Sequence, residues 1–97
     1  MDLPTSGWKN KIRARKIHCK CGSWKDHWIN NSKSPWPLLC SISGCWQSPT
    51  LGIHIRNRNV KGEYIVPACD RCRWIIDEFN LKPGVAIVPA KKQLACS

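Results

Sequence analysis

The chain has 97 residues and a formal net charge of +10, from 16 Lys and Arg against 6 Asp and Glu, and it carries 7 cysteines and 6 tryptophans. A chain of this length forms one domain and buries only about 60–65% of its unfolded surface, so a hydrophobic core alone gives a narrow margin of stability. No apolar run approaches the ~18 residues that cross a bilayer, and the N-terminus lacks the apolar core of a secretory signal. We therefore expect a cytoplasmic protein, in which clustered cysteines indicate metal ligands rather than disulfides. The alternative is a secreted domain with disulfides.

The excess of basic residues favours an anionic partner. Nucleic acid is the first candidate and an acidic protein surface is the second, since both carry the negative charge that the Lys and Arg side chains attract. No membrane partner is expected, and the oligomeric state stays open. The alternative is that the positive charge only keeps a small protein soluble.

The chain is expected to consist of a basic N-terminal arm, residues 1–17, and a cysteine-rich domain, residues 18–97. Basic residues alternate with Asn10, Ile12 and Ala14 in the arm. That period of two favours a strand or an extended segment over a helix. The arm supplies five candidate nucleic-acid-binding residues, which are Lys9, Lys11, Arg13, Arg15 and Lys16.

A tryptophan pair and a predicted β-hairpin follow the arm. Trp24 and Trp28 lie four residues apart, so they share a face if this segment is helical, with Ser23 as its cap. Residues 51–56 and 63–66 have the composition of strands. The link 57–62 contains Asn and Gly, which indicates an antiparallel hairpin.

The last third of the sequence predicts a helix and a final strand. Asp70 can cap a helix that continues to Phe79, with Ile75 and Phe79 on one apolar edge. Pro83 and Gly84 follow the end of this helix, and residues 85–88 predict a short strand. The chain is therefore expected to be a small α+β domain.

Two cysteine pairs flank the predicted hairpin. Cys40 and Cys45 precede it, and Cys69 and Cys72 follow it as C-x-x-C where the strand leads into the predicted helix. Zinc binds four thiolates or imidazoles in a tetrahedron, and two closely spaced pairs can supply them. The sequence thus predicts one Zn²⁺ held by these four cysteines, in the treble-clef-like order of knuckle, hairpin and helix. The alternatives are buried free cysteines or a redox-active C-x-x-C.

The remaining cysteines permit a second zinc site. Its candidate ligands are Cys19, Cys21, His27 and Cys96, with His54 as a substitute for one of them. The competing interpretation is that these cysteines are thiols without a metal.

Residues 40–79, about two-fifths of the chain, resemble the zinc-stapled branch of the HNH endonucleases. The resemblance rests on the C-x4-C pair, the strand around His54, and the run Ile65-Val66-Pro67-Ala68 before the C-x-x-C pair. It implies a treble-clef ββα scaffold. In this family a divalent cation is held by the first residue of a strand pair and by a histidine after the last cysteine, and the second strand residue is a histidine general base.

The catalytic residues of that family are largely missing here. His54 matches the general base, but the other three positions hold Ile53, Tyr64 and Arg73. A base without a cation to activate water is a poor phosphodiesterase. The resemblance therefore implies a nuclease-like scaffold on which His54 is a structural histidine or a zinc ligand rather than a catalyst.

Three functions follow from these patterns. The first is a non-catalytic zinc module that binds DNA or RNA through the arm and through the hairpin tip, where Arg56, Arg58 and Lys61 lie. Its stacking residues would be Trp8, Trp24 or Trp28, although core packing accounts for most of the tryptophans. The second is an adaptor or inhibitor that binds an acidic protein. The third and least favoured is an active nuclease built around His54.

Overall fold

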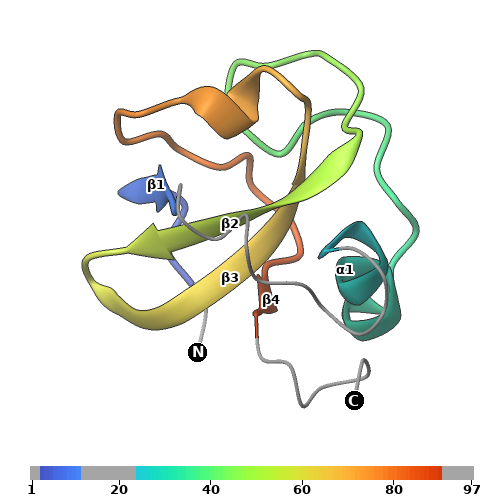
Figure 1. Ribbon diagram of the computed structural model, residues 1–97, viewed down its shortest axis with the longest axis horizontal. Helices are drawn as coiled ribbons and strands as arrows, with labels where there is room; N and C mark the ends of the chain where they lie inside the picture. Colours follow the sequence, from blue (N-terminus) through green and yellow to red (C-terminus); the bar gives the residue numbers. More distant parts are fainter. Residues whose placement is uncertain (1–2, 12–23, 91–97) are drawn as a thin grey trace.

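The computed structural model describes residues 3–11 and 24–90 of the chain. Its centre is a four-stranded antiparallel sheet in the order β1-β2-β3-β4. One helix, α1, packs beside the sheet, and the loops that carry the cysteines lie on the other side of the sheet (Figure 1). The elements are β1 (Trp8–Asn10), α1 (Trp24–Ser32), β2 (Leu51–Asn57), β3 (Val60–Ala68), the 3-10 helix η2 (Cys72–Trp74) and β4 (Val88–Pro89).

The hairpin of β2 and β3 confirms the prediction and is longer than expected. β-branched and aromatic residues face one another across the two strands, as in the opposed pairs Ile53 with Val66 and Ile55 with Tyr64. The turn contains only residues 58 and 59, and the Asn57 side chain accepts a hydrogen bond from the Asn59 amide at 2.9 Å. The residues 60–62 that were expected in the turn therefore belong to β3.

Successive side chains of each strand point to opposite faces of the hairpin, and this places two apolar clusters on the two faces. Ile53 and Ile55 of β2 belong to the larger cluster, which also contains Cys40, Cys69 and Cys72. Ile65 of β3 belongs to the smaller cluster, which contains Trp28 of α1 and Val88 of β4. The cysteines and α1 therefore pack against opposite faces of the sheet.

Helix α1 contains both Trp24 and Trp28, so the segment whose conformation the sequence left open is helical. Trp28 is buried, and its indole N–H donates to the Ala86 carbonyl at 2.8 Å. Gly52 allows the close approach of α1 to β2, because a Cβ at this position would lie 2.8 Å from the backbone of Trp24. The expected cap, Ser23, lies outside the described residues.

The helix predicted from Asp70 to Phe79 is wrong. Only the single turn η2 forms, and Ile75 already has extended backbone angles. The Asn10 side chain donates to the carbonyls of Cys72 and Ile75 at 3.0 and 2.8 Å, and the backbone of Phe79 exchanges two hydrogen bonds with Trp8. Tertiary pairing thus overrides the local helical pattern. Since this helix was the last part of the expected treble clef, the structure shows the coarser class, a small α+β fold.

The described part of the basic arm, residues 3–11, is packed into the domain. β1 pairs with the edge of β2, and Trp8 is fully buried, with its indole N–H donating to the Pro4 carbonyl at 2.9 Å. The boundary expected after residue 17 lies outside the described residues. At the other end, the strand expected over 85–88 is the two-residue β4, which pairs with β3.

Candidate metal centre

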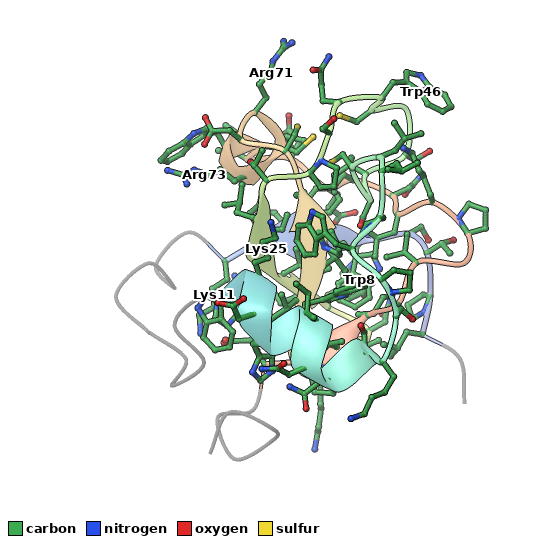
Figure 2. All side chains as sticks on the ribbon, turned by 90° about the vertical axis from the view of Figure 1, so that its right-hand side faces the viewer. Trp8, Lys11, Lys25, Trp46, Arg71 and Arg73 are labelled. Carbon is green, nitrogen blue, oxygen red and sulfur yellow. The ribbon has the colours of Figure 1, made fainter. Side chains whose placement is uncertain are left out.

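The structure brings together the four cysteines that flank the hairpin. The Sγ atoms of Cys40, Cys45, Cys69 and Cys72 all lie within 4.8 Å of one another. Cys40, Cys69 and Cys72 are buried, Cys45 is half-buried, and all four are free thiols. Figure 2 shows sulfur atoms at the end of the molecule from which Arg71 and Trp46 project, opposite α1. Such a cluster of soft ligands could hold a metal ion.

Local turns shape each half of the cluster. In the first knuckle, the Cys45 amide donates to the Ile42 carbonyl at 3.1 Å, and Gly44 has a φ of 86°, which glycine adopts without strain. In the second knuckle, the Ile75 amide donates to the Cys72 carbonyl at 3.2 Å. The two knuckles are joined directly, because the Cys69 amide donates to the Cys40 sulfur at 3.4 Å.

The spacing of the sulfur atoms suits a tetrahedral site. Zinc–sulfur bonds of about 2.3 Å at the tetrahedral angle place the sulfur atoms about 3.8 Å apart. The sulfur atoms of Cys45 and Cys69 are 3.7 Å apart, and the upper limit of 4.8 Å for the other pairs requires small side-chain movements only. The cluster therefore has the dimensions that a tetrahedral thiolate centre needs.

The environment favours a thiolate at Cys69. Burial raises the pKa of this thiol, but hydrogen bonds from the Cys72 backbone, the Cys72 and Cys45 side chains and the Arg71 backbone outweigh burial and lower the pKa to about 7. Burial raises the pKa of Cys40 and of Cys72. A metal ion would have to displace the protons of the remaining thiols, so its affinity should rise with pH.

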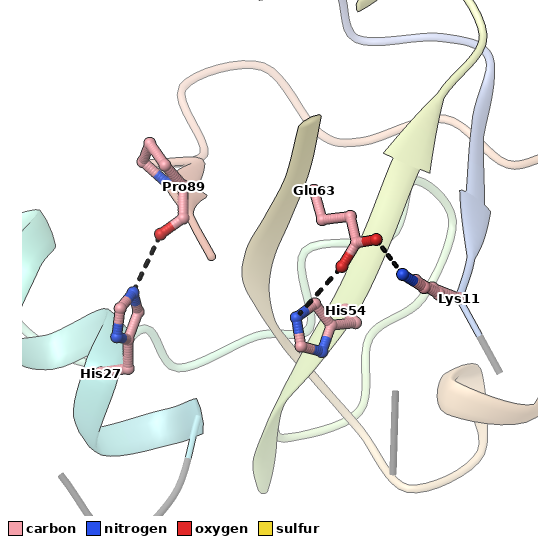
Figure 3. A network of polar contacts seen from close by, with 5 residues as sticks. All are labelled: Lys11, His27, His54, Glu63 and Pro89. Carbon is pink, nitrogen blue, oxygen red and sulfur yellow. Dashed lines mark hydrogen bonds and ion pairs between the residues drawn. The ribbon is translucent and has the colours of Figure 1, made fainter. Parts of the chain in front are cut away.

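His54 lies on the opposite side of the sheet from these cysteines, because it alternates with Ile53 and Ile55. It is 7% exposed, its ring meets Trp24 edge-on at 4.4 Å between centroids, and its Nε2 is 3.7 Å from Glu63 Oε1. Burial lowers the pKa of His54 to about 4 against the opposing influence of Glu63. Figure 3 shows His54 and Glu63 together with Lys11, whose ammonium donates a hydrogen bond to the other carboxylate oxygen of Glu63.

The predicted second metal site falls mainly on residues outside the described ranges. Cys19, Cys21 and Cys96 are among them. His27 is described and buried in α1, and its Nε2 lies 2.9 Å from the Pro89 carbonyl oxygen (Figure 3). Within 3–11 and 24–90, only the four-cysteine cluster has the spacing of a metal site.

The candidate nucleic-acid-binding residues that the structure describes lie on β1, directly after it, and near the turn of the hairpin. Lys9 and Arg56 are exposed and directly opposed on neighbouring strands, and Arg58 and Lys61 are exposed at the tip. Arg58 is 3.5 Å from Glu78, and Lys11 is half-buried in its pair with Glu63. Arg13, Arg15 and Lys16 lie outside the described residues.

The tryptophans proposed to stack on bases are in the wrong places for that role. Trp8 and Trp28 are buried and Trp24 is half-buried, whereas Trp46 is 71% and Trp74 is 62% exposed. Sequence reasoning missed these two, although Trp46 directly follows Cys45 and Trp74 lies two residues after Cys72, and short connecting segments of this kind lie on the surface. Lys82 lies over the Trp46 ring at 4.8 Å and Arg73 over the Trp74 ring at 4.6 Å.

No protein-family model, curated protein or solved structure matches this chain. The resemblance to the HNH endonucleases therefore stays an expectation from the sequence. Among the described residues, no helix is long and apolar enough to cross a membrane.

Proposed function

We propose that the four-cysteine cluster binds Zn²⁺ and that the chain is a non-catalytic module that binds nucleic acid through its basic surface. Four sulfur ligands in a tetrahedral arrangement suit zinc better than magnesium or calcium, which prefer oxygen. The centre requires reduced thiols, which fits a cytoplasmic location. The degenerate HNH scaffold and the treble-clef knuckle remain part of this proposal.

The observation that carries nucleic-acid binding is the pairing of exposed Lys9 and Arg56 on adjacent strands, continued by Arg58 and Lys61. Lys9, Arg56 and Arg58 border an open hollow of about 580 Å³, which Glu63 and Glu78 also line. The net charge of +10 adds a long-range attraction to any polyanion. Phosphate contacts from such a surface release counterions, which gives salt-dependent affinity without sequence specificity.

The surroundings of His54 support a non-catalytic role. A general base must reach the proton that it abstracts, but His54 is buried beneath Trp24. Ile53, at the position where the family has a cation ligand, lies in the apolar cluster on the opposite face. A structural histidine accounts for both observations.

One apolar groove favours a second candidate, a protein-binding adaptor or inhibitor. The groove has a volume of about 530 Å³, and Trp28, Leu38 and Leu39 are among its lining residues. Leu38 is 87% exposed, and the buried Ser41 Oγ in the same groove has no hydrogen-bond partner among the described residues. A bound peptide could cover Leu38 with an apolar side chain and donate a backbone amide hydrogen bond to Ser41 Oγ.

Salt-dependent binding tests the first candidate. We expect the chain to bind a labelled oligonucleotide with an affinity that falls linearly on a log–log plot against salt. Lys9→Gln with Arg56→Gln should reduce the slope by about 2, because each phosphate contact contributes about one unit. Lys25→Gln with Lys33→Gln removes the same charge elsewhere and should leave the slope unchanged. No binding at about 50 mM salt, or equal effects of the two pairs, would reject this function.

A further inference from the structure

A hollow of about 400 Å³ adjoins the metal centre. Three ligand cysteines line it together with Trp46, Arg71 and Ile75. Its volume lies within the range of small-ligand sites. Trp46 and Arg71 project from the same end of the molecule in Figure 2. The hollow thus combines an exposed aromatic ring, an exposed guanidinium and an apolar side chain.

Trp46 offers one open face to a ligand. Lys82 lies over the ring at 4.8 Å, and its Nζ donates to the Cys45 carbonyl, which anchors the ammonium beside the knuckle. Since 71% of Trp46 is nevertheless exposed, most of the indole surface that Lys82 does not cover is accessible. An exposed indole held in this way beside the knuckle can serve as a stacking surface.

The charges around the hollow nearly balance. Four thiolates on one Zn²⁺ leave a net charge of −2, and Arg71, Arg73 and Lys82 offset it, while Asp70 pairs with Arg73 at 3.5 Å. A polyanion is therefore not repelled, yet electrostatic attraction alone would not favour this hollow over the hairpin surface. Stacking is the interaction that the hollow adds.

We propose that this hollow is the subsite for one unpaired nucleotide, with its base stacked on Trp46 and its phosphate bound by Arg71. This inference rests on the proposed function and narrows its ligand to single-stranded nucleic acid. In the interior of a duplex both faces of each base are already stacked, so the internal base pairs cannot use the indole. The hairpin surface, in contrast, binds phosphates of either form.

Binding of one oligonucleotide sequence as single-stranded DNA, single-stranded RNA and duplex DNA, at two salt concentrations, tests the subsite. Trp46→Ala should weaken single-strand binding by roughly 5- to 100-fold at both salt concentrations and leave duplex binding and the salt slope unchanged. Trp46→Phe should retain most of the affinity, because a phenyl ring still stacks. Trp74→Ala, at the other exposed tryptophan, is the matched control and should have no such effect.

The outcomes separate the two proposals. Salt-dependent binding with no single-strand preference and no effect of Trp46→Ala would overturn the subsite and leave the basic surface in place. Equal losses in Trp46→Phe and Trp46→Ala would overturn stacking in the same way. Failure of the wild-type chain to bind any of the three nucleic acids at low salt would overturn the subsite together with the proposed function.

Discussion

His54 shows how one buried side chain sets a pH limit on this fold. The imidazole lies against Trp24 with 7% of its surface exposed, and burial lowers its pKa to about 4. In the unfolded chain the same group has a pKa near 6.5. The unfolded state therefore gains a proton between pH 6.5 and pH 4, whereas the folded state does not. Stability should fall as the pH is lowered through this window.

We expect this titration to cost about 2 kcal/mol between pH 7 and pH 5. His54→Gln removes the titrating group, so the variant should lose that much less stability over the same interval. Urea denaturation of both proteins at the two pH values gives the difference. Protonation of the ligand cysteines affects both proteins alike and cancels in the comparison. Parallel losses in the two proteins would show that His54 does not stay neutral in the folded state.

Among the elements, β1 connects the N-terminal segment to the second cysteine knuckle. Asn10 donates hydrogen bonds to the carbonyls of Cys72 and Ile75, where the chain leaves η2 in an extended conformation. Asn10→Ala would leave both carbonyls without these partners. We expect a loss of about 1–3 kcal/mol in unfolding free energy, measured by chemical denaturation.

Two further variants separate this contact from the general effect of changing β1. Asn10→Asp keeps the shape but cannot donate when ionised, so it should be at least as destabilising as Asn10→Ala. Lys9→Ala, at the exposed neighbouring position, should change stability by less than about 0.5 kcal/mol. If Asn10→Asp were neutral, the two hydrogen bonds would not stabilise the knuckle.

The contact of Asn10 with the second cysteine knuckle also explains which elements could be predicted from the sequence. The hairpin depends on nearby residues, such as the alternating Ile53 and Ile55, and was predicted correctly. The path after Cys72 depends on partners 62 and 65 residues away in the sequence, and on the pairing of Trp8 with Phe79. Helix periodicity reports only local preference, so it could not reveal this competition.

The ligands of the candidate metal site could be predicted from the sequence, but the residues that surround the site could not. The spacing of Cys40 with Cys45 and of Cys69 with Cys72 indicated four ligands, and their sulfur atoms do gather. The exposed position of Trp46 was missed, because the sequence does not show which of the tryptophans the core absorbs. Burial is a property of the packed chain, and only a structure reveals it.

At the scale of the whole molecule, the sheet separates two apolar clusters, and the one on the cysteine side contains three of the four candidate metal ligands. A small domain has a limited core, so a metal bound within that cluster would contribute directly to the folding free energy. Without the ion, four thiols would have to share a space shaped for a tetrahedral centre, with the pKa of Cys40 and Cys72 raised by burial.

Metal removal should therefore unfold the chain. Native mass spectrometry should detect at least one Zn²⁺, and a chelator should abolish most of the roughly 5–15 kcal/mol that stabilises a small domain, with recovery when Zn²⁺ is restored. Cys45→Ser should have the same effect as the chelator. Cys19→Ser is the matched control, and it should keep the Zn²⁺ of the four-cysteine cluster. If the predicted second site exists, this variant should lose a second Zn²⁺ that the wild-type chain binds. Oxidised cysteines without bound metal would exclude the zinc centre, since thiols paired in disulfides cannot serve as its four ligands.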